Sequence, residues 1–152
     1  MTTTLRVADA EAMEALGSRF ATLLAAGDLV VLDGPLGAGK TTFTRGLGAA
    51  LGARGAVTSP TFVLAREHPT AAGVPLVHVD AYRLATAREL DDLDLDYDGT
   101  IVVVEWGAGK LDGVAESWID IAIARSAADE TREVVITGHG PRWAQLDAVL
   151  AA

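Results

Sequence analysis

Residues 34–41 read Gly34-Pro-Leu-Gly37-Ala38-Gly39-Lys40-Thr41 and match the pattern G-x-x-x-x-G-K-[ST] at every fixed position. The glycines let the backbone curl until successive N–H groups point inward and form a site for an anion. A helix that begins near Lys40 adds the positive end of its dipole at the same point. In this motif the lysine reaches the β- and γ-phosphates of a nucleotide, and the hydroxyl of Thr41 is a ligand of Mg²⁺. The stretch therefore predicts a site for nucleotide phosphates.

The segments around this loop have the order that the motif requires, with a strand before it and a helix after it. Residues 29–32 form a short apolar run typical of a buried strand, and residues 41–51 have helical spacing and end before Gly52. Further strands are expected at 61–66, 74–80, 101–105, 119–123 and 134–137, and helices after Asp9, at 86–93 and after Pro141. The last two strands are expected to pair as an antiparallel edge. We therefore expect an α/β, P-loop NTPase-like fold of three layers with a mixed parallel and antiparallel central sheet, in a single P-loop domain over residues 1–152.

The composition excludes several other classes of protein. With 152 residues, the chain has the length of about one domain. The net charge of −9 argues against a protein that binds nucleic acid by itself, because Lys and Arg supply most of that affinity. The sequence contains no cysteine, which excludes disulfide partners and thiolate metal sites. Charges interrupt the apolar runs before they reach membrane-spanning length, so we expect a cytoplasmic protein with no membrane partner.

Two acids end hydrophobic runs and are candidates for holding a metal ion. Glu105 ends the run Ile-Val-Val-Val-Glu, and Asp80 ends the run Leu-Val-His-Val-Asp. Ligands of α/β sheets bind at the carboxyl ends of the strands, and a phosphate loop needs an acid there to position Mg²⁺ directly or through water. We expect Glu105 to be the metal ligand and Asp80 to orient the attacking water or to hold the metal through water. The sequence leaves the order of these two acids open, and His78 is expected to be structural.

The missing amino acids distinguish between nucleotides. GTPases of the common kind read guanine with Asn-Lys-x-Asp, and this chain contains no asparagine. The glutamine that positions water in such enzymes has one counterpart here, Gln145, which lies near the C-terminus. ATP with Mg²⁺ is therefore the expected ligand, and the domain is expected to be a P-loop ATPase.

Four ordered blocks carry a resemblance to a known family. They are Gly37-Ala-Gly-Lys-Thr-Thr-Phe-Thr-Arg-Gly46, Ser59-Pro-Thr-Phe62, His78-Val-Asp-Ala-Tyr-Arg-Leu84 and Val104-Glu-Trp106. The first block is common to phosphate-loop proteins, whereas the combination of the other three is specific. With these blocks the chain resembles the small bacterial TsaE (YjeE-type) ATPases of tRNA threonylcarbamoyladenosine biosynthesis.

The resemblance implies a set of site residues. It implies catalytic roles for Lys40, Asp80, Glu105 and Thr61. Of these, Thr61 would lie in a switch-like segment. Thr41 and Glu105 would hold Mg²⁺, and Trp106 and Arg132 would lie near the nucleotide. The full expected nucleotide-binding set is Gly34, Gly37, Ala38, Gly39, Lys40, Thr41, Thr42, Trp106 and Arg132.

The resemblance also implies partners. Members of the family hydrolyse ATP slowly alone and work with a TsaB–TsaD heterodimer, which attaches the threonylcarbamoyl group to the adenosine beside the anticodon. The tRNA would then meet this chain only indirectly, through the complex. Two other interpretations remain open at this stage, a small-molecule kinase and a non-hydrolysing module that switches partner affinity with the bound nucleotide.

Overall fold

A seven-stranded sheet organises the chain, with strand order β1-β7-β6-β2-β5-β4-β3. The computed structural model describes residues 2–35, 37–54, 65–81, 93–106, 111, 114–126 and 129–151. The strands are β1 (Thr2–Val7), β2 (Leu29–Asp33), β3 (Ala65–His68), β4 (Leu76–Asp80), β5 (Ile101–Glu105), β6 (Trp118–Arg125) and β7 (Arg132–His139). The four central strands β6, β2, β5 and β4 run parallel, whereas β1, β7 and β3 pair antiparallel with their neighbours. The predicted mixed sheet is confirmed.

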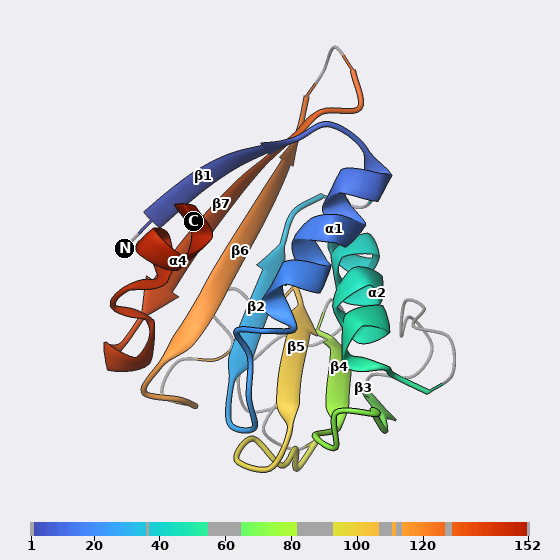
Figure 1. The fold of residues 1–152 in the computed structure, drawn as a ribbon, viewed down its shortest axis with the longest axis vertical. Helices are drawn as coiled ribbons and strands as arrows, with labels where there is room; N and C mark the ends of the chain where they lie inside the picture. The colour runs from blue at the N-terminus through green and yellow to red at the C-terminus, as the bar shows by residue number, and fades with distance from the viewer. Residues whose placement is uncertain are drawn as a thin grey trace.

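Two helices cover one face of the parallel strands, as Figure 1 shows. They are α1 (Ala10–Phe20), capped by the Asp9 side chain at its N-terminus, and α2 (Lys40–Leu51), which ends at Gly52 in the left-handed region. Phe20 and Phe43 meet edge to face beneath them, with ring centroids 5.3 Å apart. The helices therefore bury one shared apolar layer against the sheet.

Glycines allow α1 and α2 to approach closely. A Cβ atom added to Gly46 of α2 would lie 2.0 Å from the carbonyl oxygen of Glu14, and one added to Gly17 of α1 would lie 2.0 Å from that of Phe43. The hydroxyl of Ser18 donates to the carbonyl oxygen of Gly46 at 3.1 Å. Main chain thus packs on main chain, and this contact fixes where α2 begins relative to the sheet.

A second apolar cluster lies on the opposite face of the sheet. Alternate residues of β2, β4 and β5, such as Val31, Val79 and Val104, point to this side. The side chains that pack on them there include those of Leu93, Leu95, Tyr97, Leu111, Val114, Ala115 and Trp118. Strands buried on both faces read as continuous apolar runs, which is why β4 and β5 are buried at every position. The predicted three-layer α/β class is confirmed.

The C-terminal segment closes the first face beside β7 (Figure 1). A short 3₁₀ turn, η1 (Pro141–Trp143), precedes α4 (Leu146–Ala151), so the expected helical segment after Pro141 is confirmed. Arg142 donates through Nε and Nη2 to the two carboxylate oxygens of Asp28, at 2.5 and 2.7 Å. This pair attaches the end of the chain to the residue before β2.

The structure corrects two expectations. β6 and β7 do pair antiparallel, but they are not the edge, because β6 lies beside β2 and β1 pairs outside β7. The helix after Asp9 ends at Phe20 rather than near Gly27. Residues 86–92 of the helix expected at 86–93 lie outside the described residues, and so do residues 61–64 of the strand expected at 61–66. Among the described residues, no helix is long and apolar enough to cross a membrane.

Candidate functional site

The loop between β2 and α2 has the backbone geometry that its glycines allow. Gly37 and Gly39 have φ angles of +78° and +120°, which side-chain-bearing residues rarely adopt. Gly39 is the N-cap of α2, and no side chain caps the helix there. The N–H groups of the first turn of α2 are therefore directed at the loop, together with the positive end of the helix dipole. This arrangement can bind an anion.

Lys40 is folded over its own loop. Its Nζ donates to the carbonyl oxygens of Gly34 and Pro35, at 2.6 and 3.1 Å. The same ammonium lies 3.9 Å from the centre of the Trp106 ring, a distance at which a cation is attracted to the ring face. Only 4% of Lys40 is exposed.

The environment of Lys40 combines burial with negative charge. Burial lowers the pKa of its ammonium below the ordinary value. The carboxylates of Glu105, Asp33 and Asp80 act in the opposite direction and raise this pKa. Three acids thus surround one lysine at the carboxyl ends of β2, β4 and β5, and this excess of negative charge favours a further cation.

Thr41 and Glu105 bring hard oxygen atoms together. The Thr41 hydroxyl donates to the Glu105 carboxylate, with oxygen–oxygen distances of 3.1 and 3.3 Å. Asp80 is the register partner of Glu105 on the neighbouring strand β4, and the two acids are 8% and 4% exposed. Carboxylate and hydroxyl oxygens are suitable ligands for Mg²⁺, which is usually held by one or two protein groups together with phosphate oxygens and water. The residues present therefore fit a magnesium ion.

A chelating cluster is not required for that fit. Within the described ranges, no three histidine, aspartate or glutamate side chains are arranged to hold a metal ion by themselves.

Trp106 directly follows β5 and has a backbone conformation that is uncommon for its residue type. Its φ is +64°, and bulky residues are rare in this region. Its N–H donates to the carbonyl oxygen of Leu32 at 2.8 Å. The unusual turn places the indole ring beside the phosphate loop, where the sequence had placed it near a nucleotide.

His78 is the residue whose role the sequence underestimated. It is fully buried on β4 and is hydrogen-bonded through Nε2 to Oε2 of Glu105. The expectation of a structural residue therefore omitted a contact with the site. One signal was available, because His78 and Asp80 are two residues apart on a strand and must face the same side.

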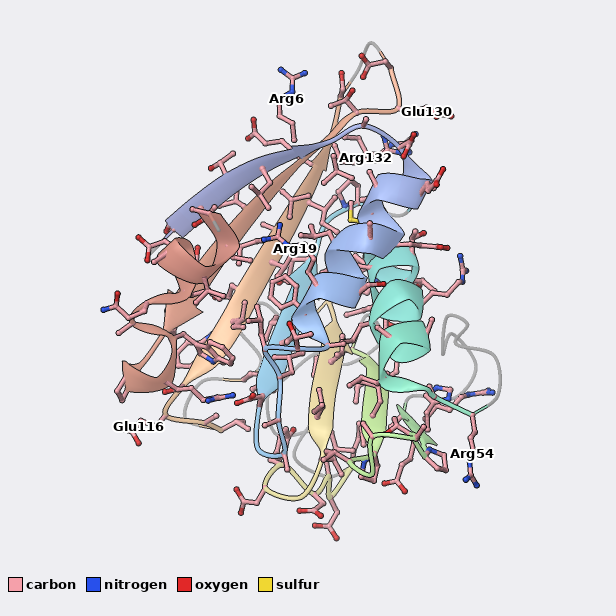
Figure 2. All side chains as sticks on the ribbon, in the orientation of Figure 1. Arg6, Arg19, Arg54, Glu116, Glu130 and Arg132 are labelled. Carbon is pink, nitrogen blue, oxygen red and sulfur yellow. The ribbon has the colours of Figure 1, made fainter. Side chains whose placement is uncertain are left out.

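Arg132 reaches the loop from the other side. Its Nε donates to the carbonyl oxygen of Ala38 at 3.0 Å. Figure 2 shows Arg132 near the N-terminal end of α1, with Arg6 and Glu130 at the same end of the molecule. Arg125, the register partner of Arg132 on β6, also lies against the loop, since a Cβ atom on Gly37 would be 3.6 Å from its Nη1.

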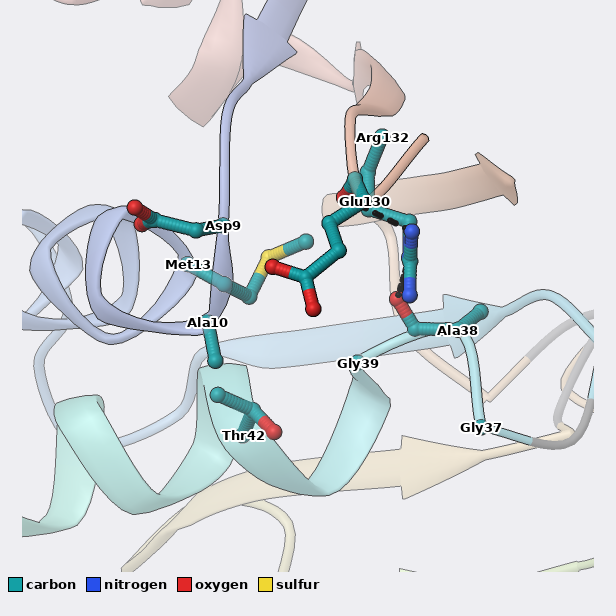
Figure 3. A pocket seen from close by; sticks show the side chains of 9 residues that line it. All are labelled: Asp9, Ala10, Met13, Gly37, Ala38, Gly39, Thr42, Glu130 and Arg132. Carbon is teal, nitrogen blue, oxygen red and sulfur yellow. Dashed lines mark hydrogen bonds between the residues drawn. The ribbon is translucent and has the colours of Figure 1, made fainter. Parts of the chain in front are cut away.

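A cavity of about 140 Å³ lies between α1, the loop and the start of β7. Figure 3 shows the Glu130 side chain pointing into it, with Met13 on the α1 side. Its lining residues are Asp9, Ala10, Met13, Gly37, Ala38, Gly39, Thr42, Glu130 and Arg132. The cavity combines an apolar wall with charged groups immediately beside the phosphate loop.

The predicted site residues fall into two groups around the loop. Lys40, Thr41, Asp80, Glu105 and Trp106 gather at the carboxyl ends of the central strands. Ala38, Thr42 and Arg132, with Gly37 and Gly39, line the cavity on the other side. The carbonyl oxygen of Gly34 accepts a hydrogen bond from the Lys40 ammonium. Thr61 lies outside the described residues. The chemical roles of these residues remain predictions.

Comparisons with known proteins agree on one family. A sequence model of the family described as "Threonylcarbamoyl adenosine biosynthesis protein TsaE" matches residues 7–134. The tRNA threonylcarbamoyladenosine biosynthesis protein TsaE of Streptomyces coelicolor is 56% identical over 147 residues, which cover 92% of this chain and 99% of the relative. The protein of the same name from Bacillus subtilis is 35% identical over 142 residues, covering 93% of this chain and 89% of the relative.

A solved structure matches the whole fold. The crystal structure of Bacillus subtilis YdiB superposes with a TM-score of 0.79 at 30% sequence identity, covering 99% of this chain and 95% of YdiB. The sequence match to the family extends from the end of β1 to β7 and so includes the phosphate loop, both acids and Arg132.

Proposed function

This chain belongs to the TsaE family of tRNA threonylcarbamoyladenosine biosynthesis proteins, and from that premise we propose that it is the ATP-hydrolysing accessory subunit of the bacterial machinery that makes this modified nucleoside. The single observation that carries the proposal is the Lys40, Thr41 and Glu105 constellation at the mouth of the phosphate loop. The two close relatives from Streptomyces and Bacillus are both named for this biosynthesis.

The phosphates are bound by the loop and the start of α2. Backbone N–H groups and the helix dipole attract the negative charge, and Lys40 exchanges its two carbonyl partners for phosphate oxygens. ATP is favoured over GTP because a chain without asparagine cannot form the usual guanine-reading motif. The loop supplies most of its donors from the backbone, so the net charge of −9 does not oppose nucleotide binding.

Thr41 and Glu105 are the residues that would hold Mg²⁺. The bound ion would neutralise charge on the β- and γ-phosphates and orient them for hydrolysis. The contact between Thr41 and Glu105 supports Glu105 rather than Asp80 as the direct ligand. Asp80, its register partner, would then orient the attacking water and accept its proton.

The nucleoside would extend from the loop into the cavity beside α1. Met13 offers an apolar wall to a base, and the carboxylates of Asp9 and Glu130 can accept hydrogen bonds from ribose hydroxyls or an amino group. Arg132 holds the loop through the carbonyl oxygen of Ala38, and its guanidinium is close enough to the loop to contribute positive charge to the nucleotide site.

The partners would be a TsaB–TsaD-like heterodimer in the cytoplasm. An acidic chain suits docking to protein rather than to tRNA, because binding of tRNA by itself would need many basic phosphate contacts. We therefore propose that the tRNA is held by the partners and that hydrolysis by this subunit drives or resets the complex.

Reconstitution tests the proposal. ATP turnover and modified tRNA should appear when the purified chain is combined with TsaB- and TsaD-like partners, tRNA, ATP and Mg²⁺. The Lys40→Ala variant should lose nucleotide binding, ATP turnover and tRNA modification. Full tRNA modification with Lys40→Ala would contradict the proposal. Rapid phosphorylation of a small metabolite without partners would instead indicate a kinase. Equal modification by wild type and a Glu105→Gln, Asp80→Asn double variant would indicate a non-hydrolysing switch.

A further inference from the structure

The hydrogen bond between His78 and Glu105 has a definite direction. An ionised carboxylate can only accept hydrogen bonds, so with Glu105 ionised the Nε2–H group of His78 donates a hydrogen bond to Oε2 of Glu105. The ring is 0% exposed. Within the described part of the chain, its Nδ1 has no hydrogen-bond partner. Among the described residues, the carboxylate of Glu105 is thus the polar partner of a completely buried imidazole.

The sheet register explains why the two side chains meet. β4 and β5 pair in parallel with His78 opposite Val103 and Asp80 opposite Glu105. Alternate residues of a strand share a face, so His78 lies on the same face as both acids, two residues before Asp80 along β4. It approaches the carboxylate of Glu105 from the core, whereas Thr41 approaches it from α2.

The surroundings of His78 would suit an apolar side chain. Its neighbours on the same face, Leu76, Ile101 and Val103, are all buried hydrophobic residues of the main core. Burial of a polar ring costs free energy unless a hydrogen bond compensates it. An imidazole at this position is therefore explained by the bond to Glu105 and not by packing.

We propose that His78 is a positioning residue that orients the Glu105 carboxylate toward the cation site beside Thr41. The glutamate side chain has three rotatable bonds, and the two hydrogen bonds hold its oxygens at the mouth of the loop. This inference rests on the proposed function, in which Glu105 is a ligand of Mg²⁺. Outer partners of metal ligands typically contribute about 10- to 100-fold to metal affinity or activity.

Three substitutions separate positioning from packing. His78→Gln places an amide N–H near the position of Nε2, so it keeps a donor for Glu105. His78→Asn keeps an amide but is too short to reach the same point, and His78→Leu fills the core without a donor. A purely structural role would favour leucine among its apolar neighbours, whereas a positioning role favours glutamine.

The readout is the Mg²⁺ concentration that gives half-maximal binding of a fluorescent methylanthraniloyl-ATP analogue. We expect His78→Asn and His78→Leu to raise it about 10- to 100-fold and His78→Gln to stay within about 3-fold of wild type. Binding of the analogue in EDTA and the thermal midpoint of unfolding are measured for each variant. The EDTA affinity should change less than 3-fold, because the backbone of the loop is intact. Equal shifts for all three variants, or shifts that follow the loss in thermal midpoint, would overturn the proposal.

Glu105→Gln distinguishes failure of this inference from failure of the proposed function. If Glu105→Gln leaves the Mg²⁺ requirement unchanged, Glu105 is not the ligand, and the metal assignment of the proposed function falls together with the role of His78. If Glu105→Gln raises the requirement while His78→Leu and His78→Asn do not, only the role of His78 is refuted. In the double variant with Glu105→Gln, His78→Asn should add no further shift, because the oxygen that it positions is already lost.

Discussion

Gly46→Ala offers a sharp test of the helix packing that positions the phosphate loop. In an exposed helix, alanine is more favourable than glycine by about 1 kcal/mol, so propensity alone predicts stabilisation. Here the added Cβ would lie 2.0 Å from the carbonyl oxygen of Glu14, and ordinary contacts begin at 3.4 Å. The two helices must therefore separate by about 1.4 Å, because neither atom belongs to a side chain that can rotate away.

The expected cost follows from three terms. Overpacking of a tight contact costs about 1–3 kcal/mol, and the main-chain clash at Gly46 puts this case at about 3 kcal/mol. Separation also breaks the hydrogen bond from Ser18 to Gly46, which contributes about 1 kcal/mol. The propensity gain of about 1 kcal/mol offsets that loss. The net destabilisation is about 3 kcal/mol, which corresponds to a fall of about 6–12 °C in the thermal midpoint of a chain of this size.

Thermal and urea unfolding followed by circular dichroism measure this effect. Ala50→Gly, at an exposed position of the same helix, is the matched control and should cost about 1 kcal/mol from propensity alone. Gly17→Ala, at the facing position, should destabilise the protein as Gly46→Ala does. A Gly46→Ala protein as stable as wild type, or more stable, would refute the close approach of α1 and α2.

Two further predictions concern the Asp28–Arg142 pair and the buried lysine. Asp28→Ala should cost about 1–2 kcal/mol and Arg142→Ala more. Arg142→Ala leaves the 4% exposed carboxylate without its cation, although the N–H of Ala25 still donates to it, whereas Asp28→Ala leaves a half-exposed guanidinium. Urea unfolding that gives the opposite order would contradict this. Burial lowers the pKa of Lys40 in the folded protein below the ordinary value of 10.5. At a pH between the folded-state and unfolded-state pKa values, the unfolded chain therefore holds more protons than the folded chain. The free energy of unfolding then rises with pH. The free energy of unfolding of wild type, minus that of Lys40→Met, should therefore increase as the pH rises toward 10.5. If this difference stays constant or decreases, Lys40 is not desolvated.

The elements that carry their own pattern could be predicted from the sequence. The loop at 34–41 and the apolar run Ile101–Glu105 have local signals, and both lie where expected. β1 (Thr2–Val7) was not predicted, although its β-branched residues and alternating exposure are typical of an edge strand. Its partner β7 is more than 120 residues away, and single-strand patterns do not report such distant pairing.

The site shows the same division between local and distant information. Lys40 and Thr41 follow from one motif, and the two acids follow from strand ends. The bond from His78 to Glu105 depends on the parallel register of β4 and β5, which the sequence does not encode locally. The left-handed backbone of Trp106 likewise has no local signal, since the residue type disfavours it.

The folded position of Lys40 makes anion binding an exchange rather than an addition. The ammonium already has two carbonyl oxygens and an aromatic ring as partners, so an incoming phosphate competes with the loop itself. The affinity for an anion then reflects the difference between the contacts of Lys40 with the ligand and its contacts with the loop. Ligands with enough negative charge to displace the loop contacts are favoured. The loop therefore discriminates between ligands by their negative charge, because a weakly charged ligand does not displace Lys40 from its carbonyl partners.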